Sequence, residues 1–171
     1  MSDTSTSTSD TSAETGLDDP EDDFSDSVMV ALLPITTDWC NIDLPHLTLV
    51  YAGEIKDLKP TDFNDMAKDV ASLAMLSSPI TLQVTGTEIF GDEGQKVDVL
   101  TLRATSALLA MRNFVEDWDA SEYPFTPHCT IGAPGSLTCM TPSMLAFDRL
   151  LLQWGKDSIT FWLKQGLPSL Y

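Results

Sequence analysis

Two short segments of this 171-residue chain repeat one pattern, and they contain its only two histidines. His46 begins the sequence His-Leu-Thr-Leu, His128 begins His-Cys-Thr-Ile, and a proline precedes each histidine. Side chains two positions apart point to the same face of a β-strand, so His46 shares a face with Thr48, and His128 with Thr130. The residues between them then face the core. The repeat predicts two similar halves, each with one strand that begins at a histidine.

Hydrophobic periodicity places these two strands in an α+β chain. Alternating or continuous apolar runs predict strands at residues 28–33, 44–52, 80–90, 97–102, 128–131, 147–154 and 159–163. Apolar residues at helical spacing predict helices at 61–76, capped by Thr61 or Asp62, and at 106–118, capped by Thr105 or Ser106. The predicted order is ββαββαβββ, with one helix in each half.

Charge divides the chain into a tail and a domain. Residues 1–26 are rich in Ser, Thr and Asp and contain no basic residue, which predicts a disordered acidic tail before a domain at 27–171. The whole chain has 9 basic and 26 acidic residues, for a net charge of −17. Such a charge repels polyanions, so binding along a long nucleic acid is not expected.

Cysteine usage and the N-terminal sequence bear on location. Cys40, Cys129 and Cys139 are an odd number with no closely spaced pair, which favours neither a disulfide framework nor a zinc site and fits a reducing compartment. The N-terminus lacks a basic and then apolar leader, and no segment has the roughly 18 apolar residues of a membrane span. We therefore expect a monomeric cytoplasmic protein without membrane contact.

The repeated pattern is suited to phosphate chemistry if the two strands meet at a cleft. Imidazole has an ordinary pKa of about 6.5, so one histidine can accept a proton while the other donates one. The hydroxyls of Thr48 and Thr130 can donate hydrogen bonds to phosphoryl oxygens. Such chemistry needs no metal and no other cofactor. Two alternatives are histidines that are only partly buried core residues and, less favoured because no third ligand has suitable spacing, paired zinc ligands.

At these residues the sequence resembles the 2H phosphoesterase superfamily, the LigT-like group, which is defined by two H-x-[ST]-x motifs. The resemblance covers most of residues 28–164 and includes the closing segment at 147–163. It implies a duplicated bilobal α+β fold, with two antiparallel sheets around a central cleft and one main helix in each lobe. It also implies a phosphodiesterase or cyclising nuclease in which His46 and His128 are the acid and base and Thr48 and Thr130 bind phosphate. Cys129 should face the core.

The resemblance extends to phage-encoded members, including the anti-CBASS type that degrades cyclic-oligonucleotide immune signals in the host cytoplasm. It therefore favours a small nucleotide or cyclic oligonucleotide as substrate. The alternatives are an RNA 2',3'-cyclic phosphodiesterase or 2'-5' RNA ligase and, from another class, a non-catalytic sponge that sequesters nucleotides. Aromatic residues near strand ends are candidates for stacking on bases: Tyr51, Phe90, Trp154 and Trp162.

Overall fold

The computed structural model describes residues 26–136 and 141–164. The predicted acidic tail lies outside the described residues, except for Asp26. Cys139 also lies outside them. The strands are β1 (Ser27–Pro34), β2 (Leu47–Glu54), β3 (Ile80–Phe90), β4 (Val97–Leu102), β5 (His128–Gly132), β6 (Met144–Trp154) and β7 (Asp157–Trp162). The helices are α1 (Asp62–Leu76) and α2 (Ser106–Phe114), with short 3-10 turns η1 (Ile55–Asp57) and η2 (Glu116–Trp118).

This order of strands and α-helices confirms the prediction made from the sequence, and the differences lie at element ends. Strand β2 begins at Leu47, later than predicted, and α2 ends at Phe114 before the 3-10 turn η2. Strand β6 begins earlier, at Met144, because its first residues pair with β3. Of the two caps proposed for α2, Thr105 is the one observed, since its Oγ1 accepts a hydrogen bond from the Leu108 N–H at 3.2 Å.

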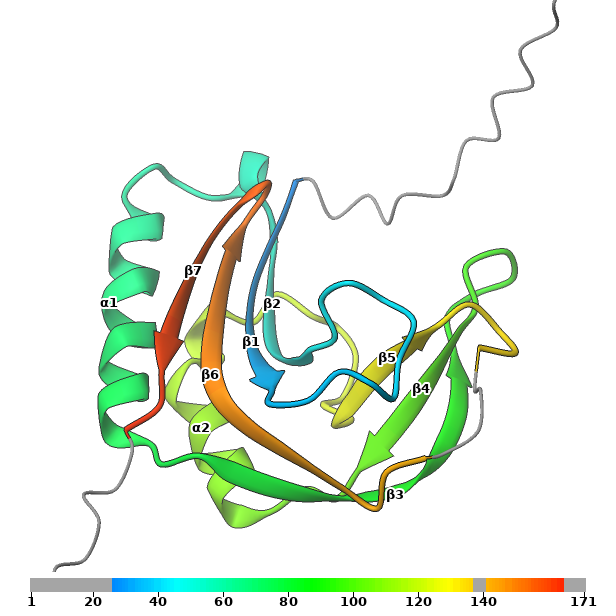
Figure 1. The fold of residues 1–171 in the computed structure, drawn as a ribbon. Coiled ribbons are helices and arrows are strands. Elements are labelled where there is room, and N and C mark those ends of the chain that lie inside the picture. Colours follow the sequence, from blue (N-terminus) through cyan, green and yellow to red (C-terminus); the bar gives the residue numbers. More distant parts are fainter. Residues whose placement is uncertain (1–25, 137–140, 165–171) are drawn as a thin grey trace, which may run out of the picture.

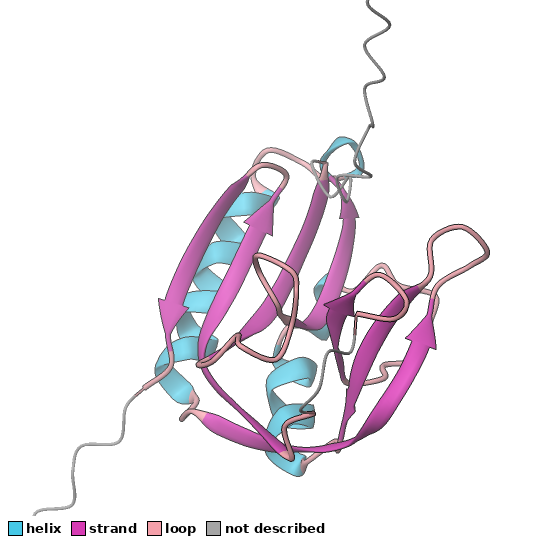
Figure 2. Cartoon of the chain, turned by 45° about the vertical axis from the view of Figure 1, so that its right-hand side comes forward, coloured by secondary structure: helices cyan, strands magenta, loops and turns pink. Residues whose placement is uncertain are grey.

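The strands form one continuous antiparallel sheet of seven strands, where two separate sheets were predicted. The strand order is β2-β1-β6-β3-β4-β5, and β7 pairs with β6 beside this path. The continuity comes from β3, whose residues 80–83 pair with β6 and whose residues 84–90 pair with β4. Figures 1 and 2 show the strongly curved sheet that results, so the two halves are only partly separate lobes.

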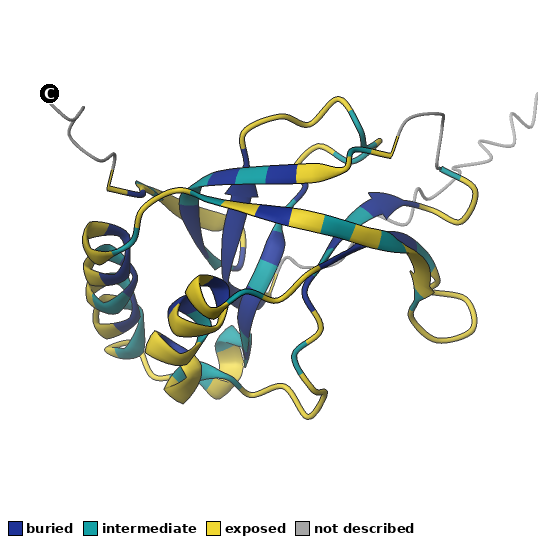
Figure 3. Cartoon of the chain, turned by 90° about the horizontal axis from the view of Figure 1, so that it is seen from below, coloured by how far each residue is buried: buried dark blue, intermediate teal, exposed yellow. Residues whose placement is uncertain are grey.

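Both helices cover one face of the sheet and enclose the main core. Helix α1 packs on β6 and β7, and α2 packs against β2 and α1. Figure 3 shows that the buried residues of the helices and strands face one another, with exposed residues on the outer sides of the helices. The core takes its residues from both halves, and its largest fully buried side chains include Leu32, Leu47, Met66, Leu108, Ile131 and Phe147. No helix in the described part of the chain is both long and apolar enough to cross a membrane.

The curvature brings the two ends of the sheet order together. Strands β2 and β5 are not hydrogen-bonded partners, but they pack against each other near the middle of the molecule (Figure 1). The Asn41 N–H, in the loop before β2, donates to the Ile131 carbonyl of β5 at 3.0 Å. The Ala120 N–H, in the segment before β5, donates to the Tyr51 carbonyl of β2 at 2.8 Å. The two histidine-led strands therefore lie side by side.

Candidate functional site

The two repeated motifs have the same pattern of burial. Pro45 and Pro127 are buried, and each histidine and the threonine two positions later are half-buried. The residue between them is fully buried in each case, Leu47 in β2 and Cys129 in β5. This alternation is the one expected for a strand with one face in the core. The prediction that Cys129 faces the core is thus confirmed.

Both imidazole rings are held in the same way by the backbone just before them. Nδ1 of His46 lies 2.9 Å from the Leu44 carbonyl, and Nδ1 of His128 lies 2.7 Å from the Thr126 carbonyl. A carbonyl oxygen can only accept a hydrogen bond, so Nδ1 carries the proton in the neutral ring. In each neutral ring Nε2 is then the nitrogen without a proton, which is an arrangement compatible with acid or base catalysis.

A β-bulge in β2 adds an aromatic side chain to the face that Thr48 occupies. Thr48 pairs with Ala31 of β1, and Tyr51 pairs with Met29, so the two pairs are three positions apart on β2 and two positions apart on β1. Paired residues share a face, and Ala31 and Met29 lie on the same face of β1, so Thr48 and Tyr51 do as well. Regular alternation would have placed Tyr51 on the opposite face.

A pocket of about 660 Å³ lies between the two halves and contains one residue of each motif, Thr48 and His128. Its other walls come from β2, from the β3–β4 turn and from the segment before β5. His46 and Thr130 are not among the residues that line it. The remaining lining residues are Leu49, Val50, Tyr51, Ile89, Phe90, Gly91, Asp92, Gln95, Asp119, Ser121, Tyr123, Pro124, Phe125 and Thr126.

Aromatic side chains line part of this pocket, and one of them contacts His128. The Phe90 ring meets the His128 ring edge to face, with 4.8 Å between centroids. Tyr51 lines the pocket from β2, and Tyr123 and Phe125 line it from the segment before β5. The last two were not predicted from the sequence, although the run Tyr-Pro-Phe-Thr-Pro directly before His128 could have drawn attention to them.

The two tryptophans proposed for stacking occupy different faces of the sheet. Trp154 packs edge to face on Phe63 of α1, with 5.3 Å between centroids, so it lies on the helix-covered face and not with the motif threonine Thr48. Trp162 is 62% exposed and pairs with Arg149, whose guanidinium lies 5.2 Å from the centre of the Trp162 ring. Arg149 pairs with Leu33 of β1, so Trp162 shares the face of Thr48, but it lies on β7, which pairs with β6 and not with β2.

The charges around the pocket limit its chemistry. Its lining includes Asp92 and Asp119 and no lysine or arginine. Nowhere in the described ranges do three or more His, Cys, Asp and Glu side chains form a group that could hold a metal ion.

Burial, with Cys40 as a second cause, raises the pKa of the Cys129 thiol far above its usual value, so this neighbour of His128 remains a neutral thiol.

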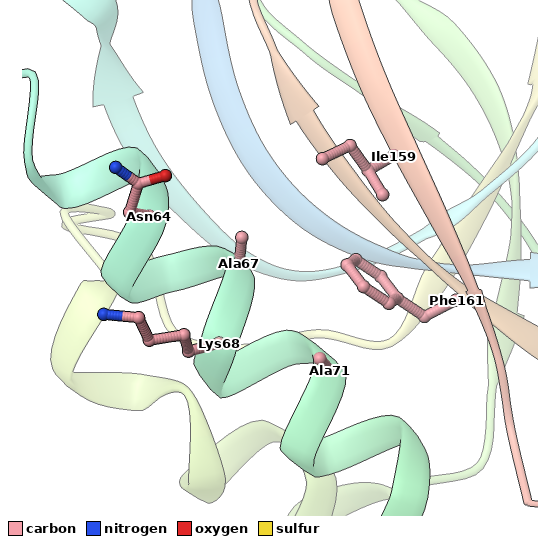
Figure 4. Close-up of a pocket in the computed structure, with 6 residues that line it drawn as sticks. All are labelled: Asn64, Ala67, Lys68, Ala71, Ile159 and Phe161. Atoms are coloured by element: carbon pink, nitrogen blue, oxygen red, sulfur yellow. The ribbon is translucent and has the colours of Figure 1, made fainter.

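A second hollow, of about 590 Å³, lies between α1 and β7, away from the pocket beside His128 (Figure 4). Figure 4 shows Ala67 and Ala71 of α1 on the side that faces Ile159 and Phe161 of β7, while the Lys68 side chain extends away from these two residues. Its lining includes none of the residues singled out from the sequence.

Comparison with known proteins places this geometry in a family. The family model described as "2'-5' RNA ligase superfamily" matches residues 41–165, which is more than half of the chain. No curated protein matches the sequence.

Solved structures share the fold at low sequence identity. TT0787 of Thermus thermophilus is 16% identical, with a TM-score of 0.56 over 82% of this chain and 100% of its own. Usb1 of Kluyveromyces marxianus is 9% identical, with a TM-score of 0.55 over 80% of this chain and 97% of its own. E. coli LigT, solved with NADP+, is 17% identical, with a TM-score of 0.51 over 81% of this chain and 95% of its own. The chain therefore has the α+β fold of LigT.

Proposed function

The chain belongs to the 2'-5' RNA ligase superfamily, the LigT-like 2H phosphoesterases, and from this premise we propose that it is a metal-independent phosphodiesterase. The observation that carries the proposal is the pocket in which Thr48 of the first motif and His128 of the second motif meet. Both histidines are half-buried and hold Nδ1 against the carbonyl two residues earlier, and His128 lines this pocket, which supports acid or base catalysis over a purely structural role.

The proposed reaction needs one proton acceptor and one proton donor. One histidine accepts the proton of the attacking group, a ribose 2'-hydroxyl or a water, through Nε2. The attacking oxygen forms a bond to phosphorus while the bond from phosphorus to the departing ribose oxygen breaks. The other histidine, protonated at both nitrogens, donates its Nε2 proton to that departing oxygen. Thr48 and Thr130 donate hydrogen bonds to the non-bridging oxygens, where negative charge must be stabilised.

We propose small cyclic or short oligonucleotides as substrates. A pocket of about 660 Å³ falls in the range of roughly 300–1,000 Å³ that is usual for small-molecule sites. The net charge of −17 and the lack of lysine and arginine in the pocket lining disfavour a long, highly charged strand. Among substrates of this size, the resemblance to phage proteins favours the cyclic-oligonucleotide signals of bacterial immunity.

The test is incubation of the full chain, in EDTA, with cyclic di- and trinucleotides, 2'-5'-linked oligoadenylate and an RNA that ends in a 2',3'-cyclic phosphate. Mass spectrometry identifies the products, and the His128→Ala protein is the matched control. Linear products from the cyclic oligonucleotides support the proposed substrate. Turnover of the RNA end alone would assign the protein to RNA processing, and ligands recovered intact after tight binding would replace the enzyme by a sponge.

A further inference from the structure

We propose that Arg112 of α2 is a positioning residue that holds residues 119–126 and, through them, the ring of His128. Residues 119–126 are called the wall segment below, because most of them line the pocket beside His128: Asp119, Ser121, Tyr123, Pro124, Phe125 and Thr126. The proposal rests on the proposed function only where it concerns turnover. Its structural part concerns the protein without substrate.

Arg112 contacts the wall segment near both of its ends. Its Nη2 donates to Oδ2 of Asp119 at 2.5 Å, and its guanidinium lies 5.2 Å from the centre of the Phe125 ring. The ion pair is largely buried, since the side chains of Arg112 and Asp119 are 17% and 13% exposed. A planar guanidinium can pair with a carboxylate and stack on an aromatic ring at the same time, which an ammonium group does less well.

The carboxylate of Asp119 passes this constraint to the other half of the molecule. Its Oδ1 accepts a hydrogen bond from the Tyr51 N–H at 3.3 Å and from the Ser121 N–H at 3.2 Å. The Ala120 N–H donates to the Tyr51 carbonyl at 2.8 Å, so the wall segment satisfies both backbone groups of Tyr51. Arg112 thereby fixes the segment against the strand that contains Thr48.

The other end of the wall segment leads directly to the catalytic ring. Phe125, which packs against the guanidinium, precedes Thr126, whose carbonyl accepts the hydrogen bond from Nδ1 of His128 at 2.7 Å. A shift of Phe125 therefore moves the acceptor that selects the His128 tautomer. The corresponding acceptor for His46 is the Leu44 carbonyl, which belongs to a different loop outside the wall segment.

The energetics favour a role in geometry over a role in stability. Burying an ion pair costs desolvation that the attraction between the charges only partly offsets. Nε of Arg112 is also buried without a hydrogen-bond partner among the described residues. A well-packed apolar residue could stabilise the fold as well at this position, but it could not hold Asp119 and Phe125 in one arrangement.

The chain contains two histidines, which allows a direct test by NMR. Long-range 1H–15N spectra of the full chain report the tautomer of each ring, and His46→Ala assigns the signals. In Arg112→Leu we expect the His128 signals to change from the Nδ1–H tautomer toward a mixture of tautomers, while those of His46 stay unchanged. Arg112→Lys, which keeps the charge, should shift them less. The control is Lys68→Met, which removes the exposed ion pair with Asp65 on α1.

Unchanged His128 signals in folded Arg112→Leu would overturn the proposal, as would equal changes in both histidines. If Arg112→Leu does not fold, Arg112→Lys and Asp119→Asn provide the same comparison. With 2',3'-cyclic AMP as the probe substrate, kcat/KM of Arg112→Leu should fall by about tenfold to a hundredfold, because small misplacements of catalytic groups have effects of this size. If the parent protein turns over neither this probe nor any member of the substrate panel above, the proposed function is contradicted, and the NMR result alone decides on Arg112.

Discussion

Strands β2 and β5 present the same short motif in the same local geometry, but their surroundings differ. In both, a buried proline precedes a half-buried histidine, whose Nδ1 contacts the carbonyl two residues earlier. Around β5, the Phe90 ring lies against His128, and the wall segment supplies further aromatic residues. Around β2, a bulge turns Tyr51 toward the pocket, and His46 is not part of its lining.

This difference indicates that the two halves, although similar in sequence, have different roles in the site. The ring geometry is symmetric because it depends on residues next to each histidine. The pocket is asymmetric because its aromatic residues come from segments other than the one that leads into His46. We therefore expect both histidines to act on the phosphate and His128 alone to be sensitive to what fills the pocket.

We expect the largest effect when either imidazole ring is removed. His46→Ala and His128→Ala should each lower kcat by about 10²-fold to 10⁴-fold, the usual contribution of one acid or base. The pH dependence of kcat/KM should be bell-shaped in the parent, and each variant should lose one limb of it. Steady-state rates from about pH 5 to pH 9 on the substrate found in the panel would measure the fall in kcat and the pH dependence of kcat/KM.

The fold should survive these changes, since both rings are only half-buried. Thermal unfolding by circular dichroism is the control. Full turnover by either variant, or loss of the same limb in both, would contradict the assignment of two different roles.

A change at Phe90 should affect the pocket at His128 and leave the surroundings of His46 unchanged. Phe90→Leu removes the ring that lies 4.8 Å from His128 but keeps an apolar side chain. We expect KM to rise by about twofold to tenfold, in line with the loss of one aromatic contact worth roughly 0.5–1.5 kcal/mol, and kcat to change less. Phe114→Leu, the same change at an exposed position of α2 outside this pocket, is the matched control. A fall in kcat with unchanged KM would place Phe90 in the chemistry and not in binding.

We expect the smallest effect in the pH dependence of the free energy of unfolding. It is tested by comparing Cys129 with Leu47, the residue at the same position of the other motif. Burial raises the pKa of the Cys129 thiol above its usual value of 9.0, so the folded protein holds this proton more tightly than the unfolded chain. That stabilisation is complete below the unfolded pKa and is lost as pH rises through the folded pKa. The free energy of unfolding should therefore fall above about pH 9 by at most about 1.4 kcal/mol per pH unit from this group.

Urea unfolding between about pH 8 and pH 10.5 measures this slope. Cys129→Ala should have a shallower slope than the parent, while Leu47→Ala lowers stability at every pH and keeps the parent slope. Equal slopes in the parent and in Cys129→Ala would show that the thiol titrates alike in the folded and unfolded states.

The sequence alone determined the elements and the local geometry of the motifs. Apolar periodicity located each strand and helix to within a few residues, because it reflects which side of an element is buried. The two Pro-His-x-Thr segments were sufficient to predict that the residue between each histidine and threonine is buried in the core. These features depend on contacts between residues close together in the chain.

Only the tertiary structure decided how the pocket is built. The long strand β3 joins two predicted sheets into one, the bulge in β2 brings Tyr51 to the face of Thr48, and the packing of Phe63 takes Trp154 to the helix side. The link from Arg112 through Asp119 to Tyr51 connects elements that are far apart in sequence. A single sequence does not reveal such contacts, because they depend on how the sheet curves and not on the preferences of neighbouring residues.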